Sequence, residues 1–100
     1  MFINGGQFVR GPGYTSFNIR GKTYILSRQA ASDLLRYNKR VSLEPSGTLS
    51  PKKGGTHEIS IPEIGEFWIF ADQLRKTIEP KGGINLAKIY EIHPINDLVN

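Results

Sequence analysis

The chain contains no cysteine, which excludes disulfide bonds, thiolate catalysis and zinc sites built from cysteine. It also has no long apolar run, because no stretch approaches the roughly 20 residues that span a bilayer. The first residues carry no basic segment followed by an apolar stretch, so they do not form a secretory signal. We therefore expect a protein that acts in the cytoplasm and makes no membrane contact.

Several motifs of well-known enzyme classes are missing as well. The sequence has no phosphate-binding Gly-x-x-x-x-Gly-Lys-Ser/Thr loop, no Gly-x-Gly-x-x-Gly, no Gly-x-Ser-x-Gly and no His-Glu-x-x-His. These absences remove support for nucleotide-dependent, dinucleotide-dependent, ordinary hydrolase and zinc-protease chemistry. The two histidines are too few for a zinc site unless a glutamate joins them. We expect no metal and no cofactor.

Positive charge is concentrated in the first part of the chain. Residues 1–57 hold nine Lys/Arg against two acidic residues, a net charge of +7. Residues 58–100 hold four Lys/Arg against seven acidic residues, a net charge of −3, which gives the overall +4. A positive region of this kind attracts polyanions, of which nucleic acid is the commonest. The alternative is a solvated surface on which charge happens to cluster.

The length and hydrophobic pattern predict a single domain over residues 1–100 with an α+β fold. We expect a mainly antiparallel sheet of four to five strands, with one longer and one short helix. The expected strands are 14–20, 23–26, 58–61, 66–70 and 86–93, with a further short strand at 7–10 inside a flexible glycine-rich entry over 1–13. The expected helices are 28–38, with Ser27 as N-cap, and 72–79.

One turn and one long loop complete this prediction. Gly21 and Lys22 suit a two-residue hairpin turn, because glycine tolerates the positive φ that such turns require. Residues 42–57 contain two prolines and three glycines, and this composition predicts a long basic loop. Loops of this length are often functional.

Candidate catalytic residues lie at the end of this loop and in the last strand. His57 can take or give a proton near neutral pH, and Lys52 and Lys53 can hold a phosphate. His93, or else Glu58, would supply the second proton-transfer group. Metal-independent RNA cleavage needs this set of groups, so it is the reaction we expect if the chain is an enzyme. Equally, His57 and His93 can be unrelated surface residues.

Candidate nucleic-acid-binding residues follow from the charge and the aromatic side chains. The basic members are Arg20, Lys22, Arg36, Lys39, Arg40, Lys52 and Lys53, and the stacking members are Tyr14 and Tyr24. Cations together with exposed rings bind single-stranded nucleic acid by neutralising phosphates and stacking on bases. The expected partner is therefore RNA or single-stranded nucleic acid, with an acidic protein surface as the alternative.

These observations leave two functions open. A basic, cysteine-free chain of this size has the profile of small bacterial ribonuclease toxins. It equally fits a non-enzymatic inhibitor of phage or mobile-element type, which would bind and block a host nucleic-acid-processing machine. No motif in the chain belongs to either class, so the sequence alone does not decide whether the protein is an enzyme.

Overall fold

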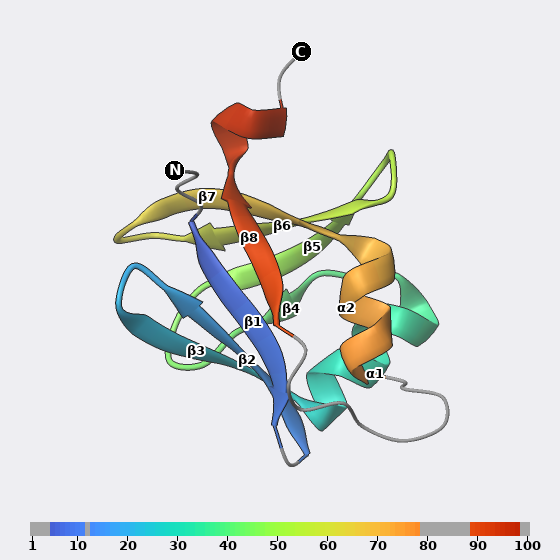
Figure 1. The fold of residues 1–100 in the computed structure, drawn as a ribbon. Helices are drawn as coiled ribbons and strands as arrows, with labels where there is room; N and C mark the ends of the chain where they lie inside the picture. The colour runs from blue at the N-terminus through green and yellow to red at the C-terminus, as the bar shows by residue number, and fades with distance from the viewer. Residues whose placement is uncertain (1–4, 12, 79–88, 99–100) are drawn as a thin grey trace.

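Eight antiparallel strands and two short helices form a nearly closed barrel in the computed structural model, which describes residues 5–11, 13–78 and 89–98 (Figure 1). The elements are β1 (Gly6–Gly11), β2 (Tyr14–Ile19), β3 (Lys22–Ser27), α1 (Arg28–Tyr37), β4 (Val41–Ser42), β5 (Thr48–Lys52), β6 (Thr56–Ile61), β7 (Gly65–Phe70), α2 (Ala71–Ile78), β8 (Tyr90–Pro94) and the 3₁₀ helix η1 (Ile95–Leu98). The expected α+β sheet of four to five strands is therefore wrong. The sheet has more strands and curves until its ends meet.

The strand order explains this curvature. The order is β3-β2-β1-β8-β7-β6-β5-β4, so β8 joins the N-terminal meander to the meander formed by β4–β7. A backbone bridge between Ile25 of β3 and Glu44, just after β4, connects the two outer members of the sheet. Because a barrel has no free sheet edges where it is closed, this bridge protects the outermost strands at one point.

The hairpin between β2 and β3 forms where the sequence predicts it, but its turn is one residue earlier. Ile19 pairs with Lys22, so the two turn residues are Arg20 and Gly21, with φ of 52° and 85°. Positive φ at both positions is the geometry of a type I′ turn, whose twist matches that of the flanking strands. Glycine therefore belongs at the second turn position rather than the first.

The predicted loop 42–57 instead contains β5 and the beginning of β6. Pro51 lies within β5, although proline lacks the N–H that a central strand needs. It is accommodated because β4 pairs with β5 only at Thr48 and Leu49, which leaves Pro51 beyond the end of that ladder. The glycine-rich segment 1–13, predicted to be flexible, also contains a strand. Its described residues 5–11 include β1, which pairs with both β2 and β8.

Helix α1 begins and ends at the signals in its sequence. The Oγ atom of Ser27 accepts a hydrogen bond from the amide of Ala30 at 3.1 Å, which confirms Ser27 as the N-cap. Asn38 adopts a left-handed conformation, and its N–H donates to the carbonyl of Leu34 at 3.0 Å. Both caps satisfy backbone groups that a helix end would otherwise leave unpaired. The second predicted helix corresponds to α2, and residues 79–88, which include parts of two predicted elements, lie outside the described residues.

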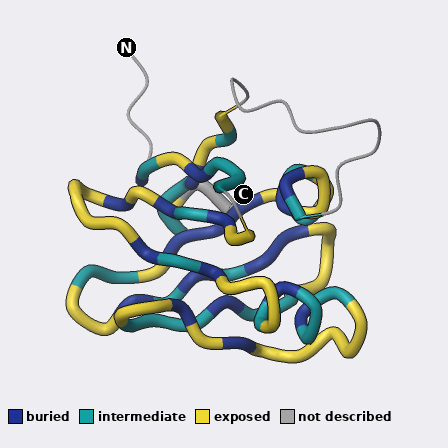
Figure 2. Tube along the Cα trace, turned by 90° about the horizontal axis from the view of Figure 1, so that it is seen from below, coloured by how far each residue is buried: buried dark blue, intermediate teal, exposed yellow. Residues whose placement is uncertain are grey.

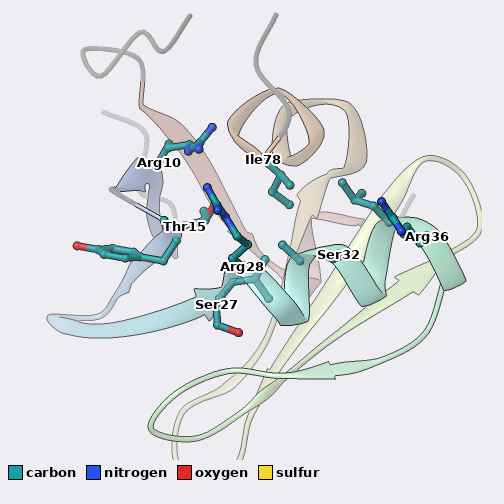
Figure 3. A pocket seen from close by; sticks show the side chains of 12 residues that line it. Arg10, Thr15, Ser27, Arg28, Ser32, Arg36 and Ile78 are labelled. Carbon is teal, nitrogen blue, oxygen red and sulfur yellow. The ribbon is translucent and has the colours of Figure 1, made fainter.

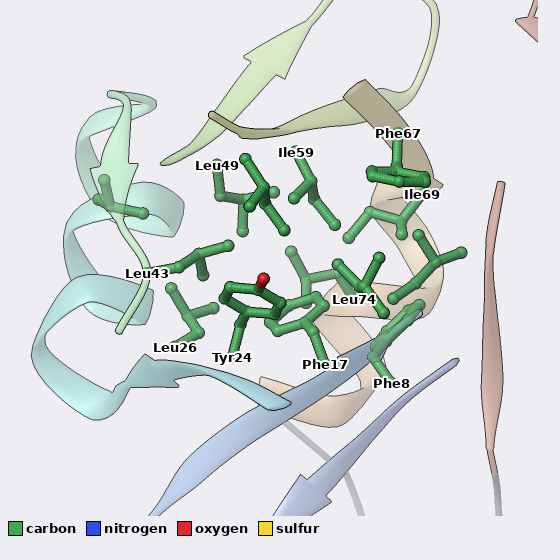
Figure 4. Close-up of a cluster of buried hydrophobic side chains, with 14 of the residues drawn as sticks. Phe8, Phe17, Tyr24, Leu26, Leu43, Leu49, Ile59, Phe67, Ile69 and Leu74 are labelled. Carbon is green, nitrogen blue, oxygen red and sulfur yellow. The ribbon is translucent and has the colours of Figure 1, made fainter. Parts of the chain in front are cut away.

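The interior of the barrel is filled by side chains from alternate residues of the strands (Figure 4). Figure 2 shows how buried and exposed residues are distributed along the chain. The buried residues include Phe8, Phe17, Tyr24, Leu26, Leu49, Ile59, Phe67, Ile69 and Ile92. Leu34 of α1 and Leu74 of α2 join the same cluster, so both helices are attached to the barrel through its core. Among the described residues, no helix has the length and apolar character needed to cross a membrane.

Candidate nucleic-acid interface

The three candidate catalytic residues occupy different faces of the sheet. His57 shares the alternation of Ile59 and Ile61 in β6, so it faces the barrel interior and is only 8% exposed. Glu58, the next residue, faces outward because successive strand side chains point to opposite faces. The structure therefore separates His57 from Glu58, although the two are adjacent in sequence.

Burial changes the protonation of His57. It lowers the pKa of the imidazole below its ordinary value of 6.5, with a smaller contribution from the positive charge of Arg75. No described residue forms a hydrogen bond with Nδ1 of His57, which is buried. The neutral imidazole is thus the form that the barrel interior favours, as expected for a basic group removed from water.

His93 lies on the outer face, in a cross-strand row with Glu58 and Trp68. Its ring stacks on Trp68, with 4.5 Å between the ring centroids. In this row, Glu58 forms an ion pair with Lys52, with 3.3 Å between Oε1 and Nζ. His57 and His93 are therefore on opposite faces of the sheet, so the structure does not bring them together as a base and acid pair.

The predicted binding residues are also spread over several parts of the barrel. Tyr24 is 1% exposed and lies in the core, so its ring presents no face on which a base could stack. Arg20 lies in the β2–β3 turn, with its guanidinium carbon 5.6 Å from the ring centroid of Phe67. Lys22 is at the same end of this hairpin. Five residues of strand, roughly 17 Å at about 3.3 Å per residue, separate this end from Tyr14.

The remaining predicted cations lie beyond α1 and at the β5–β6 turn. Lys39 and Arg40 are exposed in the connection from α1 to β4. Lys53 is exposed in the β5–β6 turn, while Lys52 is the partner of Glu58. No group of three His, Asp or Glu side chains within the described ranges is arranged to hold a metal ion.

A pocket of about 210 Å³ does bring two of the predicted residues, Tyr14 and Arg36, together (Figure 3). We call it the arginine groove. Its polar lining residues are Arg10, Tyr14, Thr15, Ser27, Arg28, Ser32 and Arg36, and its apolar lining includes Leu26, Ala31, Leu35 and Ile78. The groove thus lies where α1 and the end of α2 meet the beginning of β2.

Strand register and helix periodicity explain why these side chains converge. Arg10, Thr15 and Leu26 form one cross-strand row of β1, β2 and β3. Because Leu26 and Thr15 are buried, this row belongs to the interior face, and Arg10 ends it at the mouth of the barrel. Arg28, Ser32 and Arg36 are four residues apart on α1, which places them on one side of the helix.

The arginines have no negative partner within the part of the chain that the structure describes. Neither an ion pair nor a hydrogen bond connects Arg10, Arg28 or Arg36 to a described side chain. The carboxylate of Asp33, on the same helix, accepts a hydrogen bond from Gln29 at 3.2 Å instead. Three guanidinium groups that have no acidic partner among the described residues thus line one pocket, and guanidinium groups are the side chains that pair best with anions.

Tyr14 packs over the backbone of β1 on the outer face of the sheet, opposite to the interior row of Arg10 and Thr15. A Cβ atom at position 11 would be only 2.4 Å from Cε1 of Tyr14. Glycine at this position therefore lets the tyrosine ring lie directly over β1. The Tyr14 side chain keeps 37% exposure, so an aromatic surface lies at the rim of the groove, on the outer face of the sheet.

Arg10 and Arg28 are members of the groove that the sequence-based selection missed. Two signals point to them, and the first is that the alternation which buries Phe8 also directs Arg10 toward the same face. The pairing of Tyr14 with Ser27 then brings the beginning of α1, and with it Arg28, to the same end of the barrel. Neither signal identifies a groove without the position of α1.

The chain shows no similarity from which a function could be transferred: no protein-family model, curated protein or solved structure matches it. Its function must therefore be argued from the geometry and charge of its own residues.

Proposed function

We propose that this chain is a cytoplasmic, non-enzymatic protein that binds RNA or single-stranded DNA through the arginine groove. The observation that carries this proposal is the meeting of Arg10, Arg28 and Arg36 at one pocket with no described carboxylate partner. Guanidinium groups recognise phosphate oxygens with paired hydrogen bonds, and they remain charged at every physiological pH.

The exposed ring of Tyr14, on the outer face of the sheet at the rim of the groove, supports a nucleic acid rather than a simple polyanion. An aromatic side chain beside cations stacks on an unpaired base while the cations neutralise the backbone. A base in a duplex is not available for such stacking, which is why we propose a single strand. Lys39 and Arg40 follow α1 and would extend the positive surface beyond Arg36.

Binding should be measured by fluorescence anisotropy with a labelled oligonucleotide over a series of salt concentrations. Each phosphate contact to a single strand contributes about 0.7 to the slope of log K against log salt. We expect Arg28→Gln and Arg36→Gln each to reduce the slope by about that amount. Lys22→Gln is the control, since Lys22 lies at the other end of the β2–β3 hairpin. Affinity that is independent of salt would contradict the proposal.

The stacking contribution has a matched pair of variants. Tyr14→Ala should weaken binding by about 1–3 kcal/mol, the usual contribution of one stacked base. Tyr37→Ala removes another tyrosine, 67% exposed and at the end of α1, and should leave affinity unchanged because Tyr37 does not line the groove. Equal effects of the two substitutions would argue against a specific role for Tyr14.

The alternative partner is an acidic protein surface, as in an inhibitor that blocks a nucleic-acid-processing machine. Arginine also pairs well with carboxylates, so charge alone does not separate the two partners. Affinity capture from lysate with and without nuclease treatment does. Loss of the captured material after nuclease treatment is expected, whereas a protein that remains bound to the arginine groove would favour the inhibitor.

A further inference from the structure

The arginine groove has two ends of unequal charge. Arg10 and Arg28 lie at the end formed by β1, β2 and the beginning of α1, and Arg36 lies at the other end of α1 (Figure 3). Eight residues separate Arg28 from Arg36, which is roughly 12 Å along a helix that rises about 1.5 Å per residue. Two cations therefore face one end of the groove and one cation faces the other.

The closed floor of the groove limits what can enter it. Thr15, Leu26 and Ala31 are 2%, 0% and 5% exposed, so the pocket ends against the packed core. Its volume of about 210 Å³ is below the range of about 300–1,000 Å³ that holds a drug-sized ligand. The pocket therefore has room for an end group of a strand, while the rest of the strand must lie along its open side.

The chemistry at the strand end distinguishes the possible ligands. A phosphodiester inside a strand carries one negative charge, whereas a phosphomonoester carries about −1.5 to −2 at pH 7 and has three acceptor oxygens. Two guanidinium forks, from Arg10 and Arg28, complement the monoester in both charge and number of acceptors. The single Arg36 complements an internal phosphate.

On these grounds, and resting on the proposed function, we infer that the arginine groove binds the terminal phosphomonoester of a single strand. Arg10 and Arg28 hold the terminal phosphate, and Arg36 contacts a phosphate further along the strand. The protein would accordingly recognise phosphorylated ends in preference to the interior of a strand.

The test compares oligonucleotides of one sequence that carry a 5′-phosphate, a 3′-phosphate or hydroxyl groups at both ends. We expect one of the two phosphorylated forms to bind at least about tenfold more tightly than the hydroxyl form, because additional hydrogen bonds to charged groups each contribute roughly that factor. Equal affinity for all three forms would overturn the inference while leaving the proposed function intact. No binding of any form would overturn both.

Variants test the assignment of each arginine. Arg10→Gln and Arg28→Gln should remove the preference for the phosphorylated end, whereas Arg36→Gln should weaken all forms by the same factor. Lys22→Gln should change neither quantity. The preference is a ratio measured within one variant, so a variant that fails to fold loses all binding and is not mistaken for one that loses the preference. A preference that survives both Arg10→Gln and Arg28→Gln would overturn the assignment.

A free nucleotide carries the same phosphomonoester, so the last experiment measures its competition with the phosphorylated oligonucleotide. Adenosine monophosphate and inorganic phosphate should compete only at concentrations at least about tenfold above that of the phosphorylated oligonucleotide, since they lack the contact with Arg36. Competition by adenosine monophosphate at equal concentration would assign the groove to a mononucleotide and overturn the strand-end proposal.

Discussion

Ile25 and Glu44 each donate their backbone N–H to the carbonyl oxygen of the other, at 2.8 Å from Ile25 and 3.0 Å from Glu44. These two hydrogen bonds join β3 to the chain that follows β4, which are the two ends of the eight-stranded order. The bridge thus converts an open sheet into a nearly closed barrel. It also fixes the position of α1, because α1 is the connection between β3 and β4.

Amide hydrogen exchange provides the first test of this closure. On β3, every second N–H points away from β2, and among these the Ile25 amide has a partner in Glu44. We expect the amides of Ile25 and Glu44 to exchange more slowly than that of Thr23, which points the same way without a described partner. Two-dimensional NMR in deuterated buffer resolves these amides. Equal rates at Ile25 and Thr23 would show that the barrel opens at this point.

The second prediction concerns the attachment of α1 to the core. Leu34 is 2% exposed, so Leu34→Ala should reduce the free energy of unfolding by roughly 2–5 kcal/mol. Tyr37→Ala, at a site that is 67% exposed on the same helix, should cost much less. Urea denaturation followed by circular dichroism measures both variants. Comparable losses would mean that α1 does not pack through Leu34.

The contrast between local and distant contacts explains how much of the fold the sequence predicts. Hairpin β2–β3 and the caps of α1 depend on neighbouring residues, so Gly21, Ser27 and the alternating apolar positions are sufficient to place them. Strand β5 was missed because Pro51 conceals it, and proline is tolerated there only because β4 is short. The bridge between Ile25 and Glu44 has no local signature, and without it the sheet is not recognisable as a barrel.

The same distinction applies to the candidate residues. The alternation of Ile59 and Ile61 already places His57 on the interior face. The sequence therefore argues against His57 as an exposed catalytic group. Burial of Tyr24 follows in the same way from its pairing with Phe17. The arginine groove could not be predicted, because it depends on where α1 lies against the mouth of the barrel.

The third prediction follows from the lowered pKa of His57. The unfolded chain binds a proton at this residue near pH 6.5, whereas the folded chain binds it only at lower pH, so acid favours unfolding. The stability that His57 contributes by remaining neutral is complete above about pH 6.5 and is lost as the pH falls toward the lower folded pKa. We expect the free energy of unfolding of the wild type to fall between pH 7 and pH 5, and His57→Leu to flatten this dependence.

Denaturation midpoints at pH 8, 7, 6 and 5 separate this effect from a general change in stability. Between pH 8 and 7 the wild type and His57→Leu should run parallel, since the histidine is neutral in both the folded and the unfolded chain. Below pH 6.5 only the wild type loses stability through this residue, so the difference between the two curves should change with pH. Parallel curves over the whole range would contradict the burial of a neutral imidazole at position 57.

The fourth prediction concerns RNA cleavage. General acid–base catalysis requires the proton-transfer groups to reach the reacting atoms within hydrogen-bond distance, but His57 faces the barrel interior while His93 and Glu58 face outward. Each missing proton transfer removes about 10²–10⁴-fold in rate. We therefore expect RNA incubated with the protein in EDTA to remain intact, for the wild type and for His57→Ala alike. Gel electrophoresis of a labelled RNA is sufficient for this comparison.

One outcome would restore the ribonuclease hypothesis. The wild type would cleave the RNA, and His57→Ala, shown by circular dichroism to be folded, would not. This result would mean that the barrel opens to expose His57.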